Sequence, residues 1–532
     1  MVQLRPIPQA TQEAAPTIPE ARRVSLDRFS ANLFSGGDAR LAIDPATGAS
    51  RYGCRPFPAP ALAAFGSSTA STVSTEAYAA CATLAERFAL APAPLRARLA
   101  RLEAARLRFE LIHLCGLGDL PGLEVLFAPS GTDLHLIAAD LFGDRLFGET
   151  TALLPDPAET GSGVPLALSG RHFARTTATG AIVEPGAAVR GLAPLTIVPV
   201  ALRGASGDAR PVAAIDAEVE GLARGLLDRG QRVLIVMVDG SKTGMVAPSP
   251  ACALRLKQRA PQRVDVLVDA CQFRIAPATL RAYLDSGFLV AVTGSKFLTG
   301  PTFSGALFVP PAAAGQLSVR ASAEGLADYC AAGEWPADWE GVRGLGAEPN
   351  LGLMLRWEAA LAELRAFHRL APGEIAAVFD RFGRAVAAQL AAEPAFEALL
   401  PADLGERPGG RESWDARPTI FPFLLRHADG APFSHDETLR AYAALRRPLA
   451  PREGSPLTPA QAALPVELGQ PVALGSRDGV PISALRVCMS ARLAVEAATG
   501  GERAMLDRLR DALAKTAEVA WRVSNGAAIG AP

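Results

Sequence analysis

The feature that most constrains the fold is an alternation, between about residues 120 and 310, of short apolar runs with segments of helical periodicity. The runs are apolar throughout, so each predicts a strand that is buried on both faces. Strands of this kind that alternate with helices form a mainly parallel sheet with helices on both sides. The predicted strands are residues 123–128, 151–155, 195–202, 233–238, 264–269, 288–293 and 305–310, with helices from near Thr132 and over 216–229.

The length of the chain predicts more than one domain. At 532 residues it exceeds what one compact core usually holds. We expect an N-terminal arm and loop over residues 1–60 and a large domain over 61–335. A linking helix near 350–370 and a smaller α+β C-terminal domain would fill 336–532, so the predicted fold class is α/β with a second, smaller α+β domain.

Charge and composition exclude several classes of partner. The formal net charge is −1 and no basic patch stands out, which argues against a nucleic-acid partner. No apolar run is long enough to span a membrane, and the polar, proline-rich start has no signal-peptide core, so we expect a cytoplasmic protein. The seven cysteines are scattered with no CxxC motif, so we expect reduced core thiols and no metal site.

Lysine is scarce, and its positions are informative. Only Lys242, Lys257, Lys296 and Lys515 occur in a chain rich in arginine. A solvated cation can be arginine at little cost, whereas an amine nucleophile cannot, because arginine stays protonated. Lys257 and Lys515 lie in amphipathic helical patterns and are expected on solvated faces. Lys242 and Lys296 follow apolar strands in Gly/Ser/Thr loops, which makes them candidates for chemistry.

Four polar loops follow predicted strands and should converge at one edge of the sheet. Ligands of open α/β sheets bind beyond the carboxyl ends of the strands. The four segments are SGT at 130–132, SKTG at 241–244, DACQ at 269–272 and TGSK at 293–296. The sequence therefore predicts a binding site at this edge.

The residue types at this edge suit one cofactor. Ser130, Gly131 and Thr132 at a helix N-terminus favour an anion such as phosphate, although an ordinary N-cap has the same composition. Asp269 is a carboxylate at a strand end, where a cap or salt bridge is the alternative. With Lys296 one crossover later, these groups match what pyridoxal phosphate (PLP) requires: an anion cradle, a carboxylate for the pyridine nitrogen and an amine for the aldehyde.

The sequence resembles a family at this point. Asp269-Ala270-Cys271-Gln272, Thr293-Gly294-Ser295-Lys296 and the following segment from Gly300-Pro301 to Gly305-Ala306-Leu307 resemble the motifs of fold-type I PLP-dependent enzymes. Within that fold type, they are similar to the class V aminotransferase and cysteine desulfurase group. The resemblance implies the PLP-dependent transferase fold, a PLP cofactor and a homodimer with active sites near the subunit interface.

The resemblance also implies roles for individual residues. Lys296 would form the Schiff base, Asp269 would hold the pyridine nitrogen, and Gln272 would lie near the ring hydroxyl. Ser130, Gly131, Thr132, Thr293 and Ser295 would surround the phosphate.

Some positions depart from the family pattern. Ser241 stands where the family has an asparagine that contacts the ring hydroxyl, and Lys242 beside it is the alternative Schiff-base lysine, with an exposed loop cation as the simpler interpretation. His172 is the candidate for the ring that stacks on the cofactor, with a packing role as its alternative. Arg486, then Arg492, are the candidates for binding the substrate carboxylate, and a structural salt bridge competes with both.

The implied function is a PLP-dependent enzyme acting on an amino acid, with an aminotransferase first. A lyase or a kynureninase-like hydrolase is the alternative, and a non-catalytic protein of the same fold is the alternative from another class. A cysteine desulfurase is disfavoured because no cysteine lies between Cys330 and the apolar strand that holds Cys488.

Overall fold

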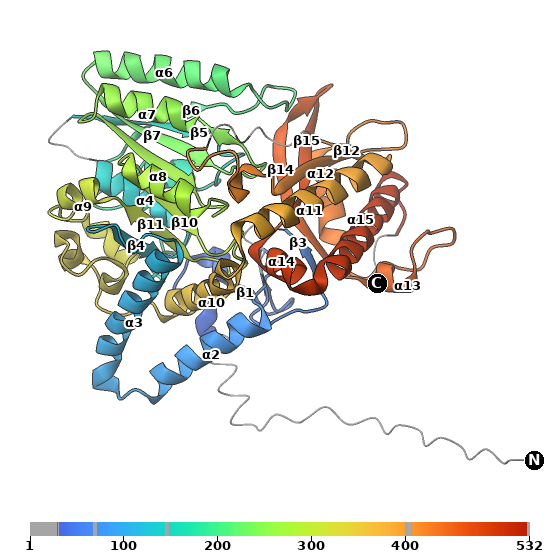
Figure 1. The fold of residues 1–532 in the computed structure, drawn as a ribbon, viewed down its shortest axis with the longest axis horizontal. Coiled ribbons are helices and arrows are strands. Elements are labelled where there is room, and N and C mark those ends of the chain that lie inside the picture. Colours follow the sequence, from blue (N-terminus) through green and yellow to red (C-terminus); the bar gives the residue numbers. More distant parts are fainter. Residues whose placement is uncertain are drawn as a thin grey trace, which may run out of the picture.

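The computed structural model describes residues 29, 31–66, 72–143, 148–399, 404 and 407–528. Two sheets organise these residues. Figure 1 shows the larger sheet with its helices on one side of the molecule and the second sheet, with the C-terminal helices, on the other.

The larger sheet contains the strands predicted between residues 120 and 310. Its spatial order is β4 (Glu124–Ala128), β11 (Gly305–Val309), β10 (Leu289–Thr293), β9 (Val264–Ala270), β7 (Arg232–Asp239), β5 (Thr150–Pro155) and β6 (Thr196–Val200), with β8 (Val246–Ala247) paired to β7. Within this path β11 is antiparallel to both of its neighbours, whereas β10, β9, β7, β5 and β6 pair in parallel. The carboxyl ends of β7, β9 and β10 therefore meet at one edge.

Alternate residues of these strands enter two separate apolar cores. Leu234 and Val236 of β7 pack in one core, and Val233 and Ile235 pack in the other, as the two-residue period of a strand requires. One face is covered by α4 (Gly131–Phe142), α5 (Val164–Leu168) and α9 (Pro311–Leu317). The other is covered by α3 (Ala93–Leu114), α6 (Val212–Asp228), α7 (Pro250–Arg259), α8 (Pro277–Asp285) and α10 (Leu351–His368). Helix α2 (Thr75–Leu90) packs against α10.

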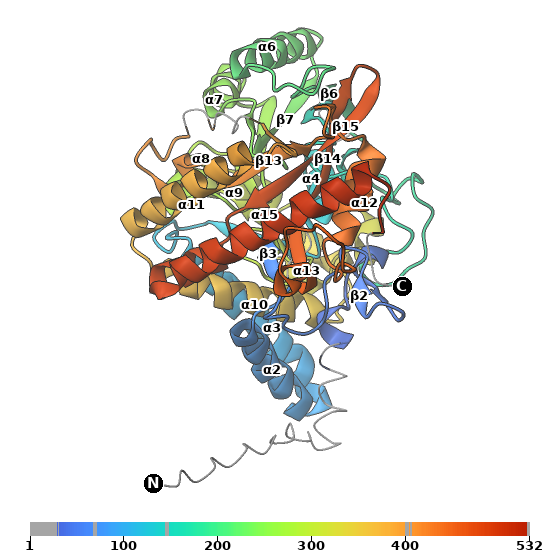
Figure 2. The same cartoon turned by 90° about the vertical axis from the view of Figure 1, so that its right-hand side faces the viewer.

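The second sheet is smaller and mostly antiparallel. Its order is β12 (Phe396–Ala398), β13 (Ile420–Leu425), β15 (Val480–Cys488), β14 (Val466–Arg477) and β3 (Ala63–Phe65). Helices α11 (Pro372–Ala392), α12 (His435–Ala444) and α15 (Glu502–Ser524) pack on one face of it (Figure 2). Helices α13 (Pro459–Ala463) and α14 (Ala491–Glu496) complete this part.

Short elements fill the connections. They are the β1 (Ile43–Asp44) and β2 (Ala49–Ser50) pair, 3-10 turns at Ala39–Leu41, Glu324–Asp328, Ala332–Glu334, Glu340–Gly344 and Trp414–Ala416, and a π-type turn at Ala497–Gly501.

The predicted fold class is confirmed: a helix-covered, mainly parallel sheet is followed by a smaller α+β unit. The domain boundaries stay a prediction. The N-terminal part of the chain contributes to the second sheet, because residues 63–65 (β3) pair in parallel with β14. Among the described residues, no helix is both long enough and apolar enough to cross a membrane.

Two expectations about side chains have different outcomes. All seven cysteines are buried and none forms a disulfide, which confirms the prediction of core thiols. The prediction of a solvated face for Lys515 is wrong, because its side chain is fully buried in α15. Its Nζ donates 2.7 Å to the carbonyl oxygen of Arg447 and also to that of Leu464, and burial lowers its pKa to about 8. Backbone carbonyls of distant segments satisfy this ammonium, which helical periodicity does not register.

Arg356 of α10 fastens the N-terminal segment to the large sheet. Its guanidinium is fully buried and donates to the carbonyl oxygens of Leu33 and Gly36, each at 3.0 Å, and to those of Ser35 and Phe303. Four carbonyl groups on two segments thus depend on one side chain for a donor.

We predict that Arg356→Leu lowers the free energy of unfolding by roughly 2–4 kcal/mol, because buried carbonyl oxygens lose their donor while most of the volume is kept. Chemical denaturation measures the change. Arg343→Leu is the control, since that side chain is 79% exposed and forms an exposed ion pair with Glu340. A change in Arg356→Leu no larger than in this control would show that the carbonyls find other partners.

Candidate active site

A cavity of about 280 Å³ lies where the carboxyl edge of the large sheet meets the second sheet. Both units line it, since Gln470, Pro471 and Arg486 come from β14 and β15. The cavity brings together most of the predicted site residues, namely Ser130, Gly131, Thr132, Asp269, Gln272, Thr293, Ser295, Lys296 and Arg486.

The start of α4 forms one wall of the cavity. Ser130 is the N-cap, and its hydroxyl accepts a hydrogen bond from the Asp133 backbone N–H. Gly131 has no room for a side chain, because a Cβ there would lie 2.8 Å from Cys271 Sγ. The glycine therefore lets the helix N-terminus approach the end of β9 closely. Free N–H groups and the positive end of the helix dipole make this wall suited to an anion.

Arg40 adds a positive charge to this wall. Its two terminal nitrogens lie 3.3 Å from the hydroxyl oxygens of Thr132 and Ser130, while Asp38 holds the guanidinium through three hydrogen bonds. The Phe303 ring lies beneath it, with the guanidinium carbon 4.8 Å from the ring centroid. Arg40 lies 90 residues from Ser130 in sequence, and no motif marks it, so the sequence did not predict it.

A buried acid stands behind the same wall. The Ser130 hydroxyl donates to Asp133 Oδ2, and the Asp133 side chain is buried. Burial, together with the nearby Asp38, raises the pKa of Asp133 to about 7. Asp133 is therefore mostly neutral below pH 7 and mostly ionised above it.

Lys296 enters the cavity from the loop after β10. Thr293 fixes the start of this loop, because its hydroxyl donates 2.7 Å to the carbonyl oxygen of Cys271. Within the part of the chain that the structure describes, the Lys296 ammonium makes no hydrogen bond or ion pair. Lys296 is thus held at its backbone, while its amine is left available for a ligand.

The Asp269 carboxylate lies at the carboxyl end of β9. Its Oδ1 accepts from the Cys271 N–H at 3.1 Å, and its Oδ2 lies 3.5 Å from Nε2 of His135 on α4. The distance to His135 is too long for a good hydrogen bond. His135 is buried and its Nδ1 lies 2.7 Å from the Gly131 carbonyl oxygen, which fixes the ring. His135 was not predicted, because a histidine on an apolar helix face gives no sequence signal of its own.

Three buried polar atoms on the cavity wall lack partners among the described residues. They are Gln272 Oε1, His135 Nε2 and Arg486 Nε. Buried polar atoms are almost always hydrogen-bonded, so unsatisfied ones at a cavity indicate a place for a ligand.

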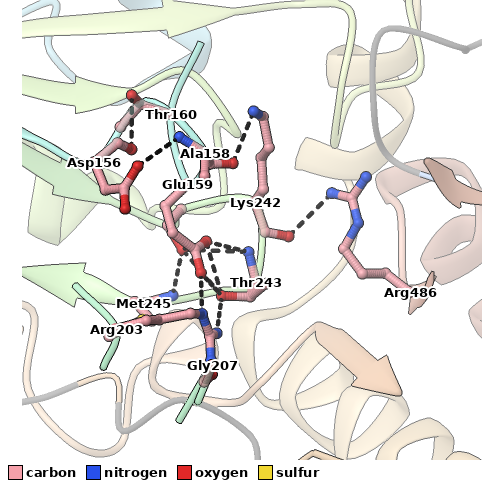
Figure 3. Close-up of polar contacts among 11 residues, drawn as sticks. Asp156, Ala158, Glu159, Thr160, Arg203, Gly207, Lys242, Thr243, Met245 and Arg486 are labelled. Atoms are coloured by element: carbon pink, nitrogen blue, oxygen red, sulfur yellow. Dashed lines mark hydrogen bonds and ion pairs between the residues drawn. The ribbon is translucent and has the colours of Figure 1, made fainter. Parts of the chain in front are cut away.

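Lys242 also lines the cavity, and the expectation of an exposed loop cation is wrong for it. Its Nζ donates to the carbonyl oxygen of Ala158 at 2.9 Å (Figure 3). It also donates to the carbonyl oxygen of Pro157 at 3.3 Å. Burial, together with the charges of Arg486 and Lys296, lowers its pKa to about 8.

Glu159, an acid whose charge acts on Lys242, is already satisfied. Arg203 pairs with it at 2.5 Å, and the Ser241 and Thr243 hydroxyls and the Thr243 N–H donate to it (Figure 3). Burial alone would raise the pKa of Glu159, but Arg203 and the hydroxyl donors outweigh it, and the pKa lies below its ordinary value. Ser241 is thereby turned toward Glu159 and is not among the residues that line the cavity.

Arg486 reaches the cavity from β15. It is 2% exposed, and it donates to the carbonyl oxygens of Lys242 at 3.0 Å and Gln470 at 2.9 Å. Its Nε has no partner among the residues that the structure describes.

Two predicted residues lie elsewhere. Arg492 pairs with Glu363 at 2.6 Å and donates to the carbonyl oxygens of Thr72 and Thr299, so it has the structural role that competed with substrate binding. His172 stacks on Tyr329, with Nδ1 2.6 Å from the tyrosine hydroxyl, which is the packing alternative. Neither is among the residues that line the cavity.

Comparisons with known proteins give similarity only at the level of structure. No family model and no curated protein matches this sequence. An aspartate aminotransferase of subgroup IV from Thermus thermophilus is 16% identical with a TM-score of 0.43, covering 84% of this chain and 99% of its own. The cysteine desulfurase CsdA from Escherichia coli is 14% identical with a TM-score of 0.45, covering 84% and 95%. Oryza sativa TDC with PLP is 14% identical with a TM-score of 0.48, covering 94% and 90%. At TM-scores below 0.5, these similarities do not indicate a reaction for this chain.

The position of Asp133 predicts a pH-dependent stability effect. The native state holds this proton more tightly than the unfolded chain does, so the contribution of Asp133 to stability falls as pH rises from about 4 to 7. Asp133→Asn removes this loss. The free energy of unfolding of the variant, measured relative to the wild type in denaturant titrations, should therefore rise by roughly 2–3 kcal/mol from pH 5 to pH 8.

Asp228→Asn is the control, because Asp228 is exposed at the end of α6. If the two variants follow the same pH profile, the Asp133 carboxyl is not protonated in the folded protein at pH 5.

Proposed function

We propose that this protein is a PLP-dependent enzyme that acts on an amino acid. The observation that carries the proposal is that one cavity holds an amine, a carboxylate and an anion-binding wall: Lys296, Asp269 and the Ser130–Thr132 turn with Arg40. Each of these groups has a different partner in the cofactor, namely the aldehyde, the pyridine nitrogen and the phosphate.

The unsatisfied atoms of the cavity fit this cofactor. Gln272 Oε1 is buried with no partner among the described residues, and an amide oxygen can accept a hydrogen bond from the ring hydroxyl. The close approach at Gly131 leaves backbone N–H groups unobstructed for the phosphate. Thr293 and Ser295, which line the same cavity, would complete the phosphate contacts.

The residues of the cavity have separate roles in the proposed reaction. Bound PLP supplies an electron sink for a carbanion at the substrate's α-carbon. Asp269 keeps a proton on the pyridine nitrogen, and His135, beside Oδ2, limits how far the carboxylate can turn. Lys296 Nζ has no fixed partner among the described residues, so it is free to hold the cofactor and then to move a proton at the α-carbon. Arg486 would bind the substrate's α-carboxylate.

Transamination is the reaction we propose within this class. It requires a mobile amine and a carboxylate-binding arginine, and both Lys296 and Arg486 line the cavity. A desulfurase would also need an accessible cysteine, whereas Cys271, the cysteine that lines the cavity, is buried with its pKa raised well above the usual value by burial and by Asp269.

We further propose that residues 61–335 form the cofactor-binding domain and 336–532 the smaller domain, after an arm over 1–60. The same resemblance suggests a cytoplasmic homodimer with active sites near the subunit interface. Light scattering of the purified protein tests the subunit number directly.

A visible absorption band tests the cofactor and its lysine. The wild type incubated with PLP should show a visible absorption band that remains after desalting and disappears in Lys296→Ala. Lys242→Ala, the matched control in the same cavity, should keep the band. If Lys296→Ala keeps the band and Lys242→Ala loses it, Lys242 is the attachment site. If the wild type shows no band, the proposed function is wrong.

The contribution of Arg40 to cofactor binding can be measured directly. Because charge-assisted hydrogen bonds to phosphate are strong, Arg40→Gln should weaken PLP binding by about 10-fold or more in a fluorescence titration of the apoprotein. Arg55→Gln, which removes an exposed arginine of the same segment, should change the affinity less than twofold. An unchanged affinity in Arg40→Gln would show that Arg40 serves only Asp38.

A further inference from the structure

Three cations gather in the cavity, and none of them forms an ion pair within the described part of the chain. Lys242, Arg486 and Lys296 all line the cavity, and the first is close enough to the other two for their charges to lower its pKa. Arg486 is buried and the Lys242 ammonium is half-buried, so solvent screens them only in part. Such a group of like charges is unfavourable unless an anion joins it.

No described acid forms an ion pair with Lys242 or Arg486, although Glu159 and Asp156 lie close enough to Lys242 to act against the lowering of its pKa. The Lys242 ammonium contacts only the carbonyl oxygens of Pro157 and Ala158, and Arg486 contacts only those of Lys242 and Gln470. Glu159, which also lines the cavity, is already satisfied by Arg203 and by two hydroxyls (Figure 3). In the described part of the chain, neither cation forms an ion pair.

The cofactor's phosphate does not fill this role. Its proposed place is the start of α4, where Arg40 already contacts the hydroxyls of Ser130 and Thr132. The α-carboxylate of an amino acid would pair with Arg486, whose fork of N–H groups suits it. Lys242 then remains without an anionic partner.

We propose that Lys242 binds an anionic group in the side chain of the substrate, so that the preferred substrate is an amino acid with an acidic side chain. This inference rests on the proposed function and narrows it to a substrate class. A lysine suits such a role because its ammonium is a point charge that accepts either a carboxylate or a phosphate. To bind the incoming anion, the Lys242 ammonium would give up its hydrogen bonds to two carbonyl oxygens.

The test uses the PLP-loaded protein and changes in its visible band. Aspartate and glutamate should bind at least 10-fold more tightly than asparagine and glutamine, which match them in size. O-phosphoserine against serine tests whether the second anion is a phosphate, and succinate, which has no amino group, reports on anion binding without reaction.

Lys242→Gln should weaken aspartate and glutamate binding at least 10-fold and change the binding of asparagine and glutamine less than twofold. Lys242→Arg should keep the preference for the acidic member of each pair. Arg255→Gln, which removes an exposed cation on α7, is the control for net charge and should alter the binding of neither the acidic nor the amide substrates. Circular dichroism and the retained visible band show that each variant is folded and loaded.

Three results would overturn the inference while leaving the proposed function intact. The wild-type band could form with no preference for acidic substrates, Lys242→Gln could weaken acidic and amide substrates equally, or it could remove the band itself. A wild type without any band would overturn both.

Discussion

The direction of the strands in the large sheet is the constraint on which the site depends. Because β7, β9 and β10 run parallel as neighbours, the loops that follow them leave the sheet at one edge. Lys242 and Lys296 come from two such loops, Asp269 lies at the carboxyl end of β9, and all three reach the same cavity. The helix that follows β4 returns over the same edge, and Gly131 lets its N-terminus approach β9. Sheet direction thus brings together groups that are more than 100 residues apart.

Acids and cations around the cavity differ in whether they have charged partners. Glu159 is satisfied by Arg203 and two hydroxyls, and Asp38 is satisfied by Arg40, so these acids serve neighbouring residues. Asp269 faces a histidine with which it is not hydrogen-bonded. The cations Lys242, Lys296 and Arg486, in contrast, have carbonyl partners or none in the described residues. The cavity is therefore built to receive negative charge, with Asp269 as the acid available to a ligand.

Sequence patterns predicted the sheet and half of the site for a simple physical reason. Buried parallel strands are apolar throughout, and chemistry at their carboxyl ends is local in sequence, so Asp269 and Lys296 could be found beside 264–269 and 288–293. Arg40 and His135 could not, because each acts through a contact made only in the folded chain. Lys515 and Arg492 have structural partners that the sequence does not reveal. The ammonium of Lys515 is held by backbone carbonyls, and Arg492 pairs with Glu363, which lies far from it in sequence.

Arg356 connects the N-terminal segment to the anion-binding wall. By holding the carbonyls of residues 33–36 against α10, it fixes the chain a few residues before Arg40. An anion bound between Arg40 and the start of α4 would hold the same segment from its other end. Occupancy of the site and protection of this segment from proteases or hydrogen exchange are then thermodynamically linked, so the backbone near residues 33–41 would report on ligand binding although it belongs to neither sheet.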